Sequence, residues 1–400
     1  MTPDLLRIED LSLSIHGAPI LRDVAMEVGR GEILGVIGES GSGKSMTALA
    51  VMGLLPQGAR ASGCIDFEGG NLLARSERAL CARRGRDIAM IFQEPMTALN
   101  PLQTIGAQVA ETVRIHRRAS RAEARRIARA TLDRVGLPEA AFPLSRYPHE
   151  LSGGQRQRVV IAMAVALRPK LLLADEPTTA PDVTTQAQIL DVLRRLVAED
   201  GMGLMLISHD LAVVADLADR LVIMRGGAVL EAGRTASVFR ERRHPYTRAL
   251  VAASAHRPER LPRLARIPLL QVENVVRSYR LPARGWFGRR ASFAAVNGVS
   301  FTLHHGESLG LVGESGCGKS TLTRAILGLD AVEAGRIALD GEQIAGGTRL
   351  ARAVRAKMQA VFQDPYGSFD PRHRVARLVA APMHLLGDPP RGASRRRAVE

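Results

Sequence analysis

The feature that most constrains this chain is a glycine-rich loop that occurs twice. The first copy is Gly38-Glu39-Ser40-Gly41-Ser42-Gly43-Lys44-Ser45, and the second is Gly313-Glu314-Ser315-Gly316-Cys317-Gly318-Lys319-Ser320. Each copy directly follows a short apolar run, at 33–37 and at 308–312. A second pair of similar segments, at 91–95 and 361–365, repeats at nearly the same distance as the loops, 270 residues against 275. Two landmarks repeated at almost the same spacing indicate a duplicated domain.

The chain is therefore predicted to contain two domains of the α/β class. Residues 256–268 are rich in proline and are predicted to link domain 1, residues 1–255, to domain 2, residues 269–400. Residues 96–167 are predicted to form a helical subdomain, because Ala124, Ala128, Leu132 and Val135 have the spacing of a helical stripe. Short apolar runs bounded by charge or glycine predict buried, largely parallel strands in domain 1. These runs lie at 33–37, 88–92, 170–174, 204–208 and 221–224.

Composition excludes several classes of function. The net charge of +15 would suit nucleic acid, but aromatic residues make up only 4% of the chain and leave little for base stacking. Four of the 55 basic residues are lysine, which indicates a general surface bias towards arginine, so no nucleic-acid partner is expected. The longest strictly apolar run, 159–167, is shorter than the ~20 residues of a membrane-spanning helix. Three scattered cysteines fit neither a disulfide framework nor a zinc site and favour a reducing cytosol.

Both glycine-rich loops have the pattern of a phosphate-binding loop in its required context, between an apolar strand and a helix. Glycines let consecutive N–H groups point at phosphate oxygens, and the helix adds its positive N-terminal end. Lys44 would neutralise the outer phosphates and Ser45 would offer its hydroxyl to Mg²⁺; Lys319 and Ser320 match them in domain 2. An ordinary glycine-rich turn would not explain two copies with lysine at the same position, in a chain where arginine is otherwise the rule.

The apolar run at 170–174 leads into two acids, Asp175 and Glu176. Such a pair is costly at the end of a buried strand unless a cation or a reaction uses the charges. Asp175 is placed to join the shell of Mg²⁺, and Glu176 to orient and activate an attacking water. Alone the pair could be structural, but the phosphate loop upstream favours the catalytic interpretation.

Ser152-Gly153-Gly154-Gln155 precedes a helical run and would by itself form another anion site at a helix N-terminus. With the loop, Gln93, Asp175-Glu176 and Ser208-His209-Asp210, in this order and spacing, it resembles the ATP-binding-cassette family. Residues 208–210 are consecutive and cannot converge as a hydrolase triad.

The resemblance implies tandem P-loop nucleotide-binding domains, each with a RecA-like core and a helical subdomain, the second copy being incomplete. It implies that two modules face each other head to tail and that residues 152–155 of one cover ATP on the loop of the other. It further implies that Gln93, matched by Gln363 in domain 2, senses Mg²⁺ and couples to membrane subunits. His209 is implied to contact the γ-phosphate.

Other segments narrow the resemblance to dipeptide and oligopeptide importers. They are 92–101, Tyr147-Pro148-His149-Glu150 and His244-Pro245-Tyr246-Thr247-Arg248-Ala249-Leu250. The fused double cassette is similar to the microcin-C and glutathione importer ATPases of that group. The resemblance implies ATP and Mg²⁺ as cofactors, integral membrane permease subunits and a solute-binding protein as partners, and a peripheral location on the cytoplasmic face of the inner membrane.

Three alternatives stay open at this point. Nickel importers share the same signals. A soluble tandem cassette acting in translation is a second possibility, although that class carries a long charged helical linker and the linker here is short. A non-hydrolysing ATP-binding regulator is a third, and Glu176 and His209 argue against it.

Departures from the family pattern affect both domains. Where the family stacks an aromatic ring on adenine, domain 1 has His16 and domain 2 has Tyr279. Pro181 stands where leucine is common and removes one N–H from an inter-module contact. Residues 269–400 contain no second signature, acidic pair or switch histidine, so no ATP site is complete within one copy. We expect either part of a longer protein, of about 520–550 residues, or a naturally degenerate second half.

Overall fold

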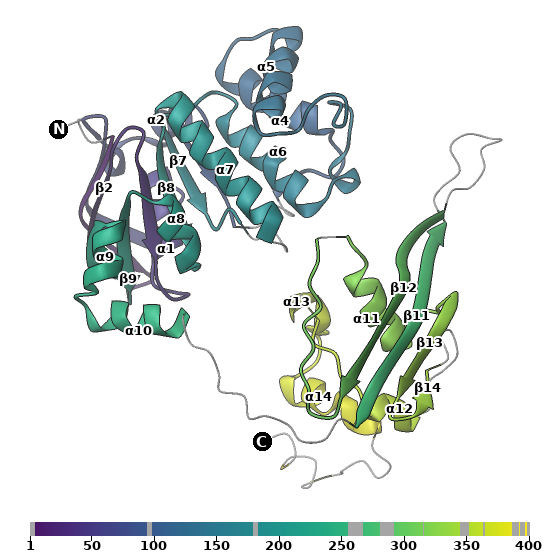
Figure 1. Cartoon of the computed structure of the whole chain (residues 1–400). Coiled ribbons are helices and arrows are strands. Elements are labelled where there is room, and N and C mark those ends of the chain that lie inside the picture. Colours follow the sequence, from purple (N-terminus) through teal and green to yellow (C-terminus); the bar gives the residue numbers. More distant parts are fainter. Residues whose placement is uncertain are drawn as a thin grey trace. The chain divides into compact units, whose positions relative to one another are not determined.

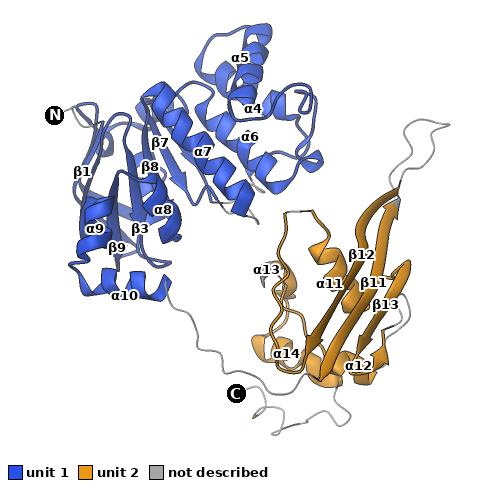
Figure 2. Ribbon diagram, viewed as in Figure 1, with its two compact units in different colours: residues 1–259 blue, residues 260–400 orange. Residues whose placement is uncertain are grey.

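The computed structural model describes residues 5–93, 98–178, 183–254, 267–280, 292–314, 316–344, 352–362 and 365–385, together with residues 392 and 397. The chain divides into two compact units, residues 1–259 and 260–400 (Figure 2). Most of the predicted linker, 256–266, lies outside the described residues, and Pro268 already begins a strand of unit 2.

A six-stranded sheet forms the centre of unit 1, in the order β10-β9-β3-β8-β7-β6. The five strands β3, β6, β7, β8 and β9 are parallel, and β10 pairs antiparallel with β9. The strands span β3 (Ile33–Ile37), β6 (Ile88–Ile91), β7 (Leu171–Asp175), β8 (Gly203–Ser208), β9 (Arg220–Arg225) and β10 (Ala228–Arg234). Every residue of β3, β7 and β8 is buried, as expected for parallel strands covered on both faces. All five strands predicted from apolar runs are confirmed.

Unit 1 has a second sheet that the apolar runs do not predict. It is antiparallel, with the order β2-β1-β4-β5. Its strands are β1 (Leu6–Ile15), β2 (Ala18–Val28), β4 (Ala59–Phe67) and β5 (Gly70–Asn71). The register of β1 shifts between Ile8 and Leu11, where Asp10 has a left-handed φ of +50°. This bulge breaks the alternation of buried and exposed residues by which a strand is usually predicted.

The helices of unit 1 cover the sheet and form a separate helical segment (Figure 1). The segment contains α4 (Ile105–His116), α5 (Arg121–Arg134), η2 (Pro148–Glu150) and α6 (Gly153–Val165). Side chains of Thr104, Ser120 and Ser152 cap the N-termini of α4, α5 and α6. The predicted stripe on α5 is confirmed, since Ala124, Ala128, Leu132 and Val135 are fully buried. The remaining helices are α1 (Lys44–Met52), η1 (Leu72–Ala74), α2 (Glu77–Arg83), α7 (Val183–Asp200), α8 (Leu211–Leu217), α9 (Thr235–Glu241) and α10 (Pro245–Ser254).

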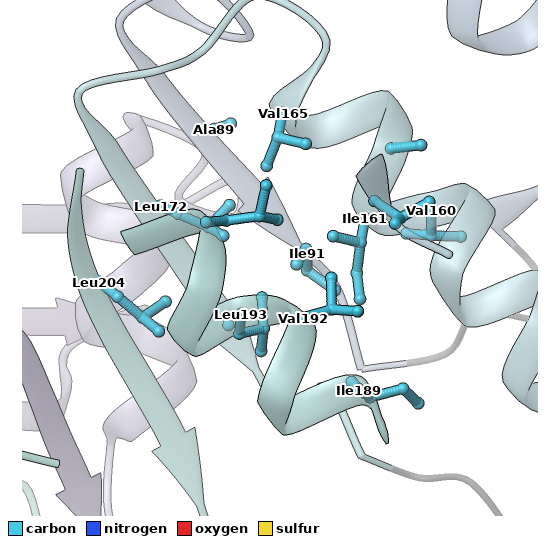
Figure 3. Packing of buried hydrophobic residues seen from close by; sticks show 14 of the residues in the cluster. Ala89, Ile91, Val160, Ile161, Val165, Leu172, Ile189, Val192, Leu193 and Leu204 are labelled. Atoms are coloured by element: carbon cyan, nitrogen blue, oxygen red, sulfur yellow. The ribbon is translucent and has the colours of Figure 1, made fainter. Parts of the chain in front are cut away.

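Helix α6 joins the helical segment to the core. It contacts α4 and α5 as well as β6 and α7. Val160, Ile161 and Val165 of α6 pack near Ile91, Leu172 and Leu204 of the sheet and near side chains of α7 (Figure 3). Burying each such side chain contributes about 1.5–3 kcal/mol, so these contacts hold the second half of α6 firmly on the sheet. No helix in the described part of the chain combines the length and the apolar character that crossing a bilayer requires.

Unit 2 repeats the antiparallel sheet of unit 1, with the order β12-β11-β13-β14. Its strands are β11 (Pro268–Arg280), β12 (Ser292–His304), β13 (Ala334–Leu339) and β14 (Glu342–Gln343). Its helices are α11 (Lys319–Ile326), α12 (Arg352–Ala356), α13 (Pro365–Ser368), α14 (Val375–Val379) and η3 (Ala381–Leu385). Residues 308–312, which correspond to β3, do not form a strand.

Candidate active site

The first glycine-rich loop connects β3 to α1. Gly43 has φ +98° and caps α1, and Gly38 lies so close to β9 that an added Cβ would be 2.1 Å from the Met224 carbonyl oxygen. A side chain at either position would force the loop to move. The loop therefore turns tightly, with the N-terminal N–H groups of α1 at its end, and this suits an anion.

Lys44 lies at the centre of this loop. Its Nζ donates to the carbonyl oxygens of Gly38 at 2.7 Å and Glu39 at 2.9 Å, and lies 3.4 Å from the Ser42 hydroxyl. Burial lowers the pKa of Lys44, and the charges of Glu176 and Asp175 oppose that shift. Ser40 and Gly41, on the rim of the loop, are exposed. Lys44 Nζ is thus held inside the loop by carbonyl oxygens. When a nucleotide binds, phosphate oxygens can take the place of these carbonyl oxygens as its hydrogen-bond acceptors.

Asp175, the last residue of β7, is a buried carboxylate beside the loop. Only 5% of it is exposed, and its Oδ1 has no hydrogen-bond partner in the part of the chain that the structure describes. Burial raises its pKa, and a hydrogen bond with Ser45 opposes the shift. A buried carboxylate oxygen that is left unpaired is costly. Together with the Ser45 hydroxyl it forms the all-oxygen donor set that a hard divalent cation such as Mg²⁺ prefers.

Glu176 follows Asp175 and has a left-handed φ of +48°. Its N–H donates to the Ile207 carbonyl oxygen at 3.0 Å, which ties the residue to β8. Its Oε2 accepts a hydrogen bond from Gln93 Nε2 at 2.9 Å, and its Oε1 lies 3.1 Å from His209 Nδ1. Two side chains from elsewhere in the sequence therefore fix the orientation of this carboxylate.

These residues come together because they follow neighbouring parallel strands. Lys44 follows β3, Gln93 follows β6, Glu176 follows β7 and His209 follows β8. In open α/β sheets, ligands bind at this carboxyl edge of the strands. Ser208, His209 and Asp210 do not form a triad, as expected: Asp210 N–H donates to the Ser208 hydroxyl at 3.0 Å, and the Asp210 side chain caps α8.

The segment 152–155 forms the start of α6. The Ser152 hydroxyl accepts from Gln155 N–H at 3.3 Å, and the Gln155 side chain accepts from Ser152 N–H at 3.0 Å, which is a capping box. Gly154 packs against α7, since a Cβ there would lie 1.9 Å from the Thr185 methyl group. Gly153 is the first residue of the helix, so its N–H belongs to the first turn, where N–H groups have no carbonyl partner within the helix. Pro181, in the adjoining segment 179–182, lies outside the described residues.

The second glycine-rich loop has nearly the same local geometry. Gly318 has φ +99° and caps α11, and Lys319 Nζ donates to the carbonyl oxygens of Gly313 and Glu314, both at 2.6 Å. Cys317 Sγ lies 3.7 Å from this ammonium, and Gly316 has φ +84°. Ser320 is exposed, and Ser315 and Gln363 lie outside the described residues.

His16 and Tyr279 do not occupy equivalent positions. His16 lies in the exposed turn between β1 and β2, where its ring packs against Gly58. Tyr279 lies within β11, with Arg277 5.0 Å from the centre of its ring. Asp10 in β1 and Asn274 in β11 both lie at a bulge and both have a left-handed φ, so the two strands can be aligned on these residues. Counted from there, Tyr279 matches Ile15, one residue before His16.

One contact with the loop is not predicted from the sequence. The hydroxyl of Tyr246, on α10, accepts a hydrogen bond from Glu39 N–H at 3.2 Å. The two residues are 207 positions apart. No local pattern signals this contact, although the segment 244–250 is itself a distinctive part of the sequence.

Comparison with known proteins agrees with this geometry. A family model described as "ABC transporter" matches residues 21–179 and again 296–398. The glutathione import ATP-binding protein GsiA of Salmonella choleraesuis is 42% identical over 424 residues, covering 96% of this chain and 68% of the relative. Its counterpart in Escherichia coli K12 has the same identity and coverage.

Solved structures of single cassettes also match. The structure of cbiO1 from Clostridium perfringens, part of the ABC transporter complex cbiONQ, has a TM-score of 0.53 and 27% identity, covering 60% of this chain and 92% of that one. The cassette MJ0796, a dimer in a post-hydrolysis state bound to ADP and Pi, has a TM-score of 0.51 and 28% identity, covering 57% of this chain and 98% of that one. The chain belongs to the ABC transporter family, as one of its ATP-hydrolysing subunits.

Proposed function

We propose that the chain binds Mg·ATP at residues 38–45 and hydrolyses it to energise an importer of peptides or glutathione-like solutes. The convergence of Lys44, Asp175, Glu176, Gln93 and His209 at one edge of the sheet supports the catalytic part. The 42% identity to proteins named for glutathione import, over 96% of the chain, supports the solute class.

Each group has a role that its contacts suit. The loop N–H groups and Lys44 bind the phosphates, while Ser45 and Asp175 would hold Mg²⁺, which when bound neutralises phosphate charge. The oxygen of a water attacks the γ-phosphorus as the bond to the β–γ bridging oxygen breaks and ADP leaves. Glu176 accepts the proton of that water. Gln93 and His209 hold the two carboxylate oxygens of Glu176 in place. His209, which is largely exposed, is also free to contact the γ-phosphate.

We further propose that a polypeptide of residues 1–400, taken by itself, hydrolyses ATP only when two copies associate. Residues 269–400 contain no segment like 152–155 and no acidic pair, so the Lys44 loop of one copy needs residues 152–155 of another. The specific ATPase rate should then be low and should rise with protein concentration, because association builds the site. Steady-state assays over a wide concentration range, with light scattering on the same samples, test this. A fast rate that is independent of concentration, from a monomer, contradicts the pairing.

The transport role is tested through the partners. The proposal expects integral membrane permease subunits, and through them a solute-binding protein, with the chain bound peripherally on the cytoplasmic face. The chain should co-purify with permease subunits from a membrane extract. ATPase activity of that complex should increase when solute-binding protein loaded with glutathione or a short peptide is added. Stimulation by nickel-loaded protein alone, or co-purification with ribosomes in place of membrane subunits, would contradict the proposal.

A further inference from the structure

Tyr246 connects the C-terminal part of unit 1 to the phosphate loop. It lies in the first turn of α10 and is only 6% exposed. Its hydroxyl oxygen accepts the Glu39 N–H at 3.2 Å, and the Glu39 carbonyl oxygen accepts from Lys44 Nζ at 2.9 Å. The residue held by Tyr246 is therefore one that supports the lysine.

The ring of Tyr246 is held in place from the sheet side. The guanidinium carbon of Arg225, the last residue of β9, lies 4.8 Å from the centre of the ring, a cation–π arrangement. The preceding residue, Met224, has its carbonyl oxygen packed against Gly38. The ring of Tyr246, the end of β9 and the phosphate loop are therefore in contact with one another. A small movement of the ring would displace the loop.

One acid, Glu231 of β10, binds the main chain around Tyr246 at several points. Its carboxylate accepts from the Thr247 hydroxyl at 2.5 Å, from Arg243 N–H at 3.0 Å and from His244 N–H at 3.1 Å. His244 Nδ1 in turn accepts the Tyr246 N–H at 3.1 Å. The distinctive segment from His244 to Thr247 is explained by these bonds, which fix the direction in which the tyrosine points.

We propose that Tyr246 is a positioning residue of the nucleotide site. Its hydroxyl holds the backbone of Glu39 in the conformation that binds phosphate, so the segment 242–247 helps to set nucleotide affinity. Glycines at 38, 41 and 43 leave the loop few side-chain contacts of its own, and an outside restraint reduces the conformational entropy lost on binding. The Lys319 loop belongs to unit 2, whereas Tyr246 belongs to unit 1, so the Lys319 loop serves as an internal control.

Tyr246→Phe tests the contact, because it keeps the ring on Arg225 and removes only the hydroxyl. Hydrogen–deuterium exchange of the full chain without nucleotide should be about 3–10-fold faster in peptides covering 38–45, and unchanged in peptides covering 313–320. This measurement is independent of whether 38–45 binds phosphate, on which the rest of the proposal depends. Unchanged exchange at 38–45 overturns the proposal.

Nucleotide binding tests the consequence. In a Lys319→Ala background, which weakens ATP binding at the second loop, Tyr246→Phe should raise the Kd and KM for ATP about 3–10-fold while kcat changes less than about twofold. Tyr147→Phe, a partly exposed tyrosine of the same unit, should change neither. Faster exchange with unaltered affinity would show that Tyr246 is only structural. A parent chain that binds no ATP would instead refute the proposed function.

A second variant covers the case in which Tyr246→Phe unfolds the protein. Thr247→Val removes one of the bonds to Glu231 and leaves the tyrosine intact. It should speed exchange at 38–45 in the same direction by a smaller factor, about 2–3-fold. No change at 38–45 in this variant would count against the proposal.

Discussion

The two glycine-rich loops are nearly identical in sequence and in local shape. Gly43 and Gly318 have φ +98° and +99°, and each lysine donates to the first two carbonyl oxygens of its loop. Because unit 1 and unit 2 place different structure around them, this shape must come from the loop residues themselves. Glycine at the left-handed positions and a lysine long enough to reach back suffice to form it.

What surrounds the loops is very different. Ile37, at the end of β3, is 1% exposed between β8 and β9, whereas Val312, its counterpart, is 94% exposed. In the described part of unit 2, no strand pairs with residues 308–312. In unit 1, therefore, the burial of Lys44 and the presence of acids beside it both depend on strands contributed by residues 171–225. A phosphate loop can be formed locally, but a catalytic site requires the long-range sheet.

The largest expected effect follows from the proposal that the residues that hydrolyse ATP all belong to unit 1. Glu176→Gln keeps the shape and the bonds of the side chain but removes the base, so ATP turnover should fall about 10²–10⁴-fold with little change in ATP affinity. Steady-state kinetics and nucleotide binding on the same preparation measure this. Glu199→Gln, a partly exposed acid at the end of α7, is the matched control. Near-normal turnover would move the catalytic role elsewhere, with His209 as the next candidate.

A pair of substitutions tests the difference in burial directly. Ile37→Ala should destabilise unit 1 by about 2–5 kcal/mol, because it leaves a cavity under the loop. Val312→Ala, at the matching position, should change the stability of unit 2 by less than about 0.5 kcal/mol. Thermal unfolding followed by limited proteolysis distinguishes the two units. Equal destabilisation would mean that 308–312 is packed in solution as β3 is.

The two lysines should differ in the same direction. Lys44→Ala removes a charge-assisted contact to phosphate worth roughly 1.5–3 kcal/mol, so ATP affinity at this loop should fall roughly 10–150-fold. Lys319→Ala should lower ATP affinity at the second loop by a smaller factor, because that loop is exposed and charge interactions there are screened by solvent. Titration of each variant with labelled ATP measures both. A larger loss from Lys319→Ala would reverse the ranking of the two sites.

The sequence predicts some of these features and not others, for physical reasons. Buried parallel strands are continuous apolar runs, so β3, β6, β7, β8 and β9 are predicted correctly. Strand β1 is missed because its bulge at Asp10 interrupts the alternation. A resemblance to known ATPases supplied Gln93 and His209, since no spacing rule places either beside Glu176. The contact from Tyr246 to Glu39 joins residues 207 positions apart and needs the folded chain.

The smallest effect concerns Glu231, the acid of unit 1 that binds the segment around Tyr246. Burial of this carboxylate opposes ionisation, but hydrogen bonds from Thr247, His244 and Arg243 outweigh it and hold its pKa below the ordinary value. An acid whose pKa is lowered by folding stabilises the folded state at pH values above its ordinary pKa, about 4.3 for glutamate. This stabilisation is lost as the pH falls through the pKa of the folded state.

Glu231→Gln should therefore lower the free energy of unfolding by about 1 kcal/mol at pH 7, a Tm decrease of about 2–4 °C, and by less near pH 3.5, which is below the ordinary glutamate value. Glu241→Gln is the control, since its partner Arg243 is largely exposed and such surface pairs are worth little. Thermal unfolding of parent and variants at both pH values measures the difference. An equal penalty at both pH values would mean that the carboxylate acts through shape and not through charge, and that the turn from 242 to 247 is held by packing.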